Sequence, residues 1–189
     1  MRLITVLALF VTSICAVSGI AQSVAPDVAA AGRQFVERLS RGEYAALESQ
    51  FTDAMKAVLN DAKEIICVGT SSEELPVGVS AQDGSASEEW RAARRAEQIA
   101  VWVRASLEKP VPVRKLNAGY HVATAQKRAA DTSDQRRVVI ILVLDHDEGT
   151  NIDEALRSAM LKEHDRAPIF ETLLTRYSLA KGPAFSWVP

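Results

Sequence analysis

Seven consecutive apolar residues, Val138 to Leu144, constrain the fold of this chain more than any other segment. The run is short for a helix, is rich in β-branched residues, and lacks the alternation of a strand that has one face in water. A strand of this kind needs cover on both faces. The run therefore predicts a central strand in a layered protein, with helices packed against the sheet.

Two further strands and one long helix are predicted upstream of this run. Ile65 to Val68 is typical of a short buried strand, and Val113 to Tyr120 of a second strand. Between them, Ser85 to Glu108 is predicted to be a helix with Ser87 as its N-cap. Its core stripe consists of Ala96, Ile99, Ala100, Val103 and Leu107. We expect an α/β (α+β) layered fold, with a small mixed sheet of three or more strands and helices packed on it.

Helical segments are predicted on both sides of this region. Apolar residues at steps of three and four predict a helical pair over residues 26–62. Asn151 and Glu154 have the spacing of a capping box, a second helix is expected around Ile169 to Tyr177, and the end of the chain is expected to be irregular. The predicted organisation is a leader (1–21), an N-terminal helical segment (26–62), an α/β domain (63–148) and a C-terminal helical extension with an irregular tail (149–189).

The first 21 residues have the layout of a secretory signal peptide. Met1 and Arg2 precede an almost wholly apolar stretch, and the small residues Gly19 and Ala21 precede a cut before Gln22. This predicts a periplasmic or secreted bacterial protein with no membrane span after cleavage. The alternative is an uncleaved anchor, because Leu3 to Ile20 is just long enough to span a bilayer. Cleavage would leave Cys67 as the only cysteine, and its apolar surroundings predict a buried small residue rather than a nucleophile.

The charge balance and the motif search exclude several function classes. The 22 basic and 24 acidic residues give a net charge of −2, which does not favour broad binding to nucleic acid. The chain has no phosphate-binding loop, no nucleophile elbow, no Cys and His residues at the spacing of zinc ligands, and no dinucleotide-binding motif. The acidic cluster Asp145 to Glu148 is interpreted as a polar turn rather than a metal site, and His121 and His164 as surface residues. No metal, cofactor or catalytic residue is therefore predicted.

The order of elements resembles the OmpA-like peptidoglycan-associating domain over about residues 60 to 145. The resemblance is carried by Gly69-Thr70-Ser71-Ser72 at the end of a strand, Arg94-Arg95-Ala96 on a helix, Gly119-Tyr120, and Gln135-Arg136-Arg137-Val138-Val139-Ile140 opening a later strand. It implies that Arg95 binds the diaminopimelate carboxylate of a cell-wall peptide, with Thr70, Ser72 and Arg136 beside it. Arginine suits this role because a guanidinium can bind a carboxylate through two hydrogen bonds.

This chain departs from the pattern of that family at three points. Ser72 stands where the family has an aspartate, so the ligand's ammonium group loses its partner unless Glu73 or Glu74 replaces it. The loop from Ser71 to Glu89 is longer, and Arg91-Ala92 replaces Leu-Ser at the start of the helix motif. Each group of arginines also has an interpretation without ligand binding. The helix arginines can form a solvated face, and Arg136 with Arg137 can cover a sheet edge.

Two functions follow from these observations. The first is an exported, non-enzymatic cell-envelope protein that docks on peptidoglycan or on another envelope protein. The second rests on Phe35-Val36, Gly42-Glu43-Tyr44, Phe51 and Met55, which resemble the helical start of ketosteroid-isomerase-like cone folds with a small-molecule pocket. The sheet discriminates between them, because the first requires mixed strands flanked by helices and the second a curved antiparallel sheet.

Overall fold

The computed structural model describes residues 6–11, 53–73, 80–122, 132, 135–162, 168–181 and 185–189. Most of the predicted helical pair, Glu74 and His164 lie outside these residues. The elements are β1 (Val6–Val11), α2 (Asp53–Asp61), β2 (Glu64–Ser71), α3 (Ala81–Ala105), β3 (Val113–Tyr120), β4 (Val138–Val143), α4 (Ile152–Lys162), α5 (Pro168–Arg176), the 3-10 helix η5 (Ser178–Lys181) and β5 (Ser186–Val188).

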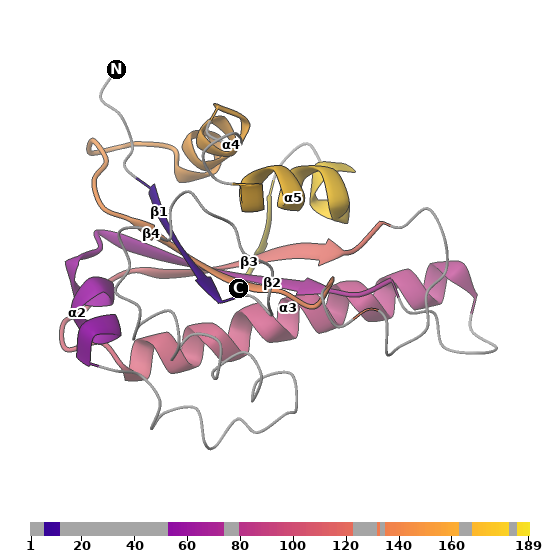
Figure 1. Ribbon diagram of the computed structural model, residues 1–189, viewed down its shortest axis with the longest axis horizontal. Coiled ribbons are helices and arrows are strands. Elements are labelled where there is room, and N and C mark those ends of the chain that lie inside the picture. The colour runs from indigo at the N-terminus through magenta and orange to yellow at the C-terminus, as the bar shows by residue number, and fades with distance from the viewer. Residues whose placement is uncertain are drawn as a thin grey trace.

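The strands form one mixed sheet in the order β1-β4-β2-β3-β5. β2 and β3 are parallel, and α3 connects them, whereas β4 runs antiparallel to β2. The three predicted strands thus lie in one sheet. The α/β layered fold is confirmed: the sheet lies between α3 on one face and α4 with α5 on the other (Figure 1).

Each face of the sheet has its own hydrophobic core. On the α3 face, alternate residues of β4 pack against the predicted stripe of α3, and Leu59 of α2 joins them. This core contains Leu59, Ala62, Ile65, Cys67, Ile99, Ala100, Trp102, Val103, Val138, Ile140 and Leu142. On the opposite face, Ile66, Val68, Val139 and Ile141 pack against α4, α5 and Tyr177. The double cover explains why the β4 run contains no polar residue.

The long helix starts earlier than predicted. Ser80, and not Ser87, is the N-cap, because the Ser80 hydroxyl accepts a hydrogen bond of 3.1 Å from the Asp83 backbone N–H. Ser87 lies inside the helix, so its assignment as the cap is wrong. The helix ends at Ala105 with Ser106 as its C-cap, three residues before the predicted end at Glu108.

The C-terminal extension is helical as predicted, but its described end contains a strand and is not wholly irregular. The Asn151 side chain accepts hydrogen bonds from the backbone N–H groups of Asp153 and Glu154, which confirms the N-cap of α4. The tail adds β5 antiparallel to β3. A carboxylate oxygen of Asp153 accepts hydrogen bonds from Trp187 Nε1 at 3.0 Å and the Phe185 backbone N–H at 3.2 Å. These contacts hold the tail against α4.

Part of the predicted leader is an edge strand in this structure. β1 pairs antiparallel with β4, from Val6 opposite Val143 to Val11 opposite Val138. No helix within the described residues is long and apolar enough to cross a membrane. The described strands form a mixed sheet with helices on both faces, rather than the curved antiparallel sheet that the cone-fold alternative requires.

Candidate functional site

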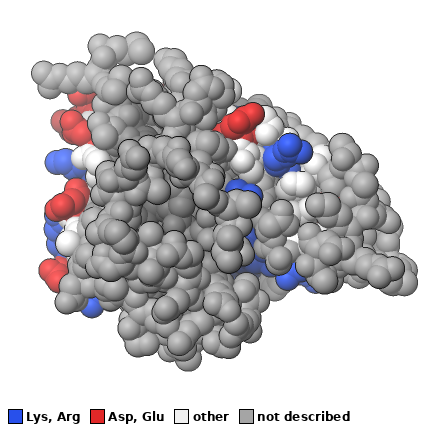
Figure 2. Space-filling model, in the orientation of Figure 1, with Lys and Arg blue, Asp and Glu red and all other residues white. Residues whose placement is uncertain are grey.

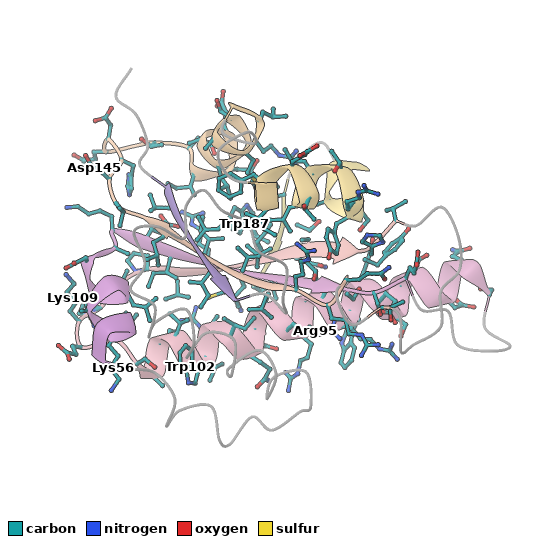
Figure 3. The ribbon with its side chains drawn as sticks, in the orientation of Figure 1. Lys56, Arg95, Trp102, Lys109, Asp145 and Trp187 are labelled. Carbon is teal, nitrogen blue, oxygen red and sulfur yellow. The ribbon has the colours of Figure 1, made fainter. Side chains whose placement is uncertain are left out.

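The predicted site residues converge at the carboxyl end of β2. Gly69 lets α3 approach β2 closely, because it has no side chain. A Cβ atom at that position would lie 2.1 Å from the Ala92 carbonyl oxygen and 2.5 Å from the Ala96 nitrogen. The backbone of α3 therefore rests directly on β2. Arg95, between these two contact points, donates a hydrogen bond of 2.6 Å from Nη1 to the Thr70 carbonyl oxygen. Figure 3 shows Arg95 on the α3 side of the sheet and Trp187 on the opposite side.

Thr70 joins the end of β2 to the start of β4. Its backbone N–H donates to the Arg137 carbonyl oxygen at 3.1 Å, and its hydroxyl oxygen accepts from the Arg137 backbone N–H at 2.6 Å. The hydroxyl also lies 3.1 Å from the carbonyl oxygen of Gln135. Arg136 stands between these two residues, and its Nη2 donates to the Thr132 hydroxyl at 3.2 Å. The structure thus brings Arg95, Thr70 and the backbone of Arg136 together.

Ser72 and Glu73 do not supply the carboxylate that the family pattern places in this loop. Ser72 is 2% exposed. The Glu73 side chain is 6% exposed, and its Oε1 accepts a hydrogen bond of 3.1 Å from Gln135 Nε2. The Gln135 Oε1 in turn accepts from the Glu73 backbone N–H at 3.1 Å. Because Glu73 is committed to Gln135, it does not present its carboxylate to a ligand beside Arg95.

His121 belongs to this end of the sheet and is not the surface residue that the sequence suggested. Its side chain is 19% exposed, its Nδ1 lies 4.0 Å from Glu73 Oε2, and its ring meets the Tyr177 ring edge-on at 5.4 Å. The Tyr177 hydroxyl donates to the Gln135 carbonyl oxygen at 2.6 Å. The partners of His121 lie 48 and 56 residues away in the sequence, so no local pattern could have found this cluster.

Neither Ser71 nor Cys67 of β2 has the environment that nucleophilic catalysis requires. The Ser71 hydroxyl is buried and makes no hydrogen bond within the described residues, although the backbone of Ser71 neighbours His121. An activated serine needs a base within hydrogen-bond distance. Cys67 is fully buried, and burial raises the pKa of its thiol far above the usual range. Cys67 is thus a core residue, as predicted.

The helix arginines differ from one another in their surroundings. Arg91 pairs with the buried Glu88, and Arg94 pairs with Glu97 at 2.8 Å in an exposed position. The solvated-face interpretation therefore fits Arg94, whereas Arg95 is half-buried against β2. On the face shown in Figure 2, acidic and basic side chains of the described residues are interspersed along the left side, whereas basic side chains predominate among the coloured residues on the right.

The acidic turn after β4 is held by local hydrogen bonds. The Asp147 carbonyl oxygen accepts from the Thr150 hydroxyl at 2.6 Å and from its backbone N–H at 3.1 Å. Among the described residues, no group of three or more His, Cys, Asp or Glu side chains could hold a metal ion.

No family model, curated protein or solved structure matches this chain. The candidate site is therefore defined by its own geometry. Arg95 of α3 is hydrogen-bonded to the Thr70 carbonyl oxygen at the carboxyl end of β2, in a parallel β2–α3–β3 unit.

Proposed function

We propose that this protein is an exported, non-enzymatic component of the bacterial cell envelope, and that Arg95 binds a carboxylate of a peptidoglycan peptide. The observation that carries this proposal is the hydrogen bond between Arg95 Nη1 and the Thr70 carbonyl oxygen. It joins the helix arginine to the end of β2, which is the pairing that the OmpA-like resemblance requires.

The order of strands also supports the proposal. The parallel β2–α3–β3 unit, with β4 antiparallel to β2, places the motifs of the resemblance at one end of the sheet. Arg95 is held by its contact with Thr70, so it loses less conformational freedom when it binds than a mobile side chain would. Ser72 replaces the aspartate of the family, and the Glu73 side chain is buried and bound by Gln135, so among the described residues the site has one charged contact where the family has two, and we expect weak binding.

Binding to purified cell-wall sacculi, and titration with a diaminopimelate-containing peptide, test this site. Hydrogen bonds to charged groups contribute about 1.5 to 3 kcal/mol, so Arg95→Ala should weaken binding about tenfold or more. Arg94→Ala is the matched control, because Arg94 lies on the same helix in an exposed pair with Glu97, and its loss should leave the affinity unchanged.

Binding that survives Arg95→Ala would refute the role of Arg95. If neither the wild-type protein nor Arg94→Ala binds sacculi or the peptide, the peptidoglycan ligand is wrong, and another envelope protein becomes the partner to seek.

Export has a separate test. The apolar stretch and the small residues Gly19 and Ala21 lead us to expect that the native protein begins at about Gln22 and is recovered from the periplasm or the medium. Mass spectrometry of the native N-terminus measures this directly. A cytosolic protein that keeps Met1 would contradict the proposal.

A further inference from the structure

The outer edge of β4 depends on a strand that the proposed export would remove. β4 pairs with β2 along its inner edge and, within the described residues, with β1 along its outer edge. β1 lies wholly inside the predicted leader, residues 1–21. Cleavage before Gln22 would therefore take β1 away and leave the outer backbone N–H and C=O groups of β4 without their present partners.

Between its charged ends, β4 carries none of the features that keep an exposed strand from pairing. Native sheets protect their edges with charged side chains, prolines or bulges. β4 reads Val-Val-Ile-Ile-Leu-Val, its pairing with β1 is continuous, and all six residues are buried. An uncovered β4 would therefore pair with another strand.

We propose that the outer edge of β4 in the mature protein pairs with β4 of a second copy, joining two sheets into one through an antiparallel, two-fold symmetric contact. This inference rests on the proposed export, because only cleavage frees the edge. A second copy is favoured over an unrelated strand because the apolar run can pair with itself along its whole length and the charges at its two ends are opposite.

The backbone of β4 selects the register of this contact. The Thr70 backbone N–H donates to the Arg137 carbonyl oxygen, so Arg137 turns its backbone groups toward β2. By the alternation of an antiparallel ladder, Val138, Ile140 and Leu142 turn theirs outward. A two-fold axis through Ile141 sets Val138 opposite Leu144 of the second copy, and Ile140 opposite Leu142. The whole apolar run is paired, and the α3 layers of both copies lie on one face of the joined sheet.

The charges at the ends of β4 complement each other in this register. β4 is preceded by Arg136 and Arg137 and followed by the acidic turn that begins at Asp145. The axis through Ile141 places Arg137 directly opposite Asp145 of the second copy, and the symmetry repeats this pair at the other end. A parallel arrangement would instead bring like charges together. Such exposed pairs add little affinity, but they favour one orientation and register.

Cysteine substitution tests the register in the exported protein, after mass spectrometry has established where it begins. Arg137→Cys and Asp145→Cys are introduced together and separately, and the mass is measured by light scattering and by non-reducing electrophoresis. In an antiparallel pair without mutual hydrogen bonds, opposed Cα atoms lie about 4.5 Å apart, within disulfide range. We expect a dimer in solution and a covalent dimer in the double variant alone.

The single variants are matched controls. In the proposed register, a cysteine at position 137 or 145 lies far from the same position of the second copy, so a single variant cannot form the disulfide. The native Cys67 is fully buried and does not interfere. A protein that begins at Gln22 yet is monomeric at about 100 µM, or a dimer whose double variant does not crosslink on oxidation, overturns the β4 pairing alone. A protein that keeps Met1 overturns both this inference and the proposed export.

Discussion

Ile141→Asp should abolish stable folding or lower the melting temperature of this protein by about 10 °C or more. Ile141 is completely buried in β4, opposite Ile66 of β2, and it packs in the core beneath α4 and α5. An unpaired carboxylate in such a place costs several kcal/mol, a large part of the 5 to 15 kcal/mol that stabilise a typical domain. For a chain of this length, each kcal/mol corresponds to about 2 to 4 °C.

Val101→Asp is the control for this prediction. Val101 is 56% exposed on α3, so the same change from a β-branched residue to aspartate places the charge in water. Thermal unfolding followed by circular dichroism should show a small shift for Val101→Asp and a large one for Ile141→Asp. Equal midpoints for Ile141→Asp and the wild type would mean that β4 is not a core strand.

Gly69→Ala should separate α3 from β2. The added methyl group would lie within 2.5 Å of two backbone atoms of α3, and neither can move without the helix. Overpacking of this kind costs typically 1 to 3 kcal/mol, and we expect the upper part of that range because backbone meets backbone. The displacement should also break the contact between Arg95 and the Thr70 carbonyl oxygen.

Gly149→Ala separates this steric effect from the general cost of replacing a glycine. Gly149 has a φ of +77° and nothing within 4 Å of its virtual Cβ atom, so its substitution costs only the backbone strain, about 1 to 2 kcal/mol. Urea unfolding measures both variants. If Gly69→Ala is no more destabilising than Gly149→Ala, the close packing of α3 on β2 is wrong.

The strands and the packing face of α3 could be predicted because their signals are local. β3 has its predicted bounds, and β4 differs from the predicted strand by one residue at its end. The start of α3 was missed because Ser80, Ser85 and Ser87 are all acceptable caps, and only the contact with Asp83 distinguishes Ser80.

Features that depend on distant partners could not be predicted. β5 pairs with β3, and Asp153, more than thirty residues upstream, binds Phe185 and Trp187, so the prediction of an irregular end is wrong for Ser186–Val188. For the candidate site, the resemblance to the OmpA-like domain predicted Arg95 near Thr70, and the structure has a hydrogen bond between them. Nothing in the sequence indicated that the distant Gln135 would bind the Glu73 carboxylate.

Gln135 couples the local unfolding of two parts of the chain, the residues after β2 and the end of α5. Its side chain holds Glu73 after β2, and its carbonyl oxygen accepts from Tyr177 at the end of α5. A further hydrogen bond of 2.7 Å joins the Val122 backbone N–H, just beyond β3, to the Arg176 carbonyl oxygen. Breaking any of these contacts weakens the others, so transient local unfolding at this end should be cooperative. Glu73, just after β2, and the end of α5 would then share one opening event and one rate of amide hydrogen exchange.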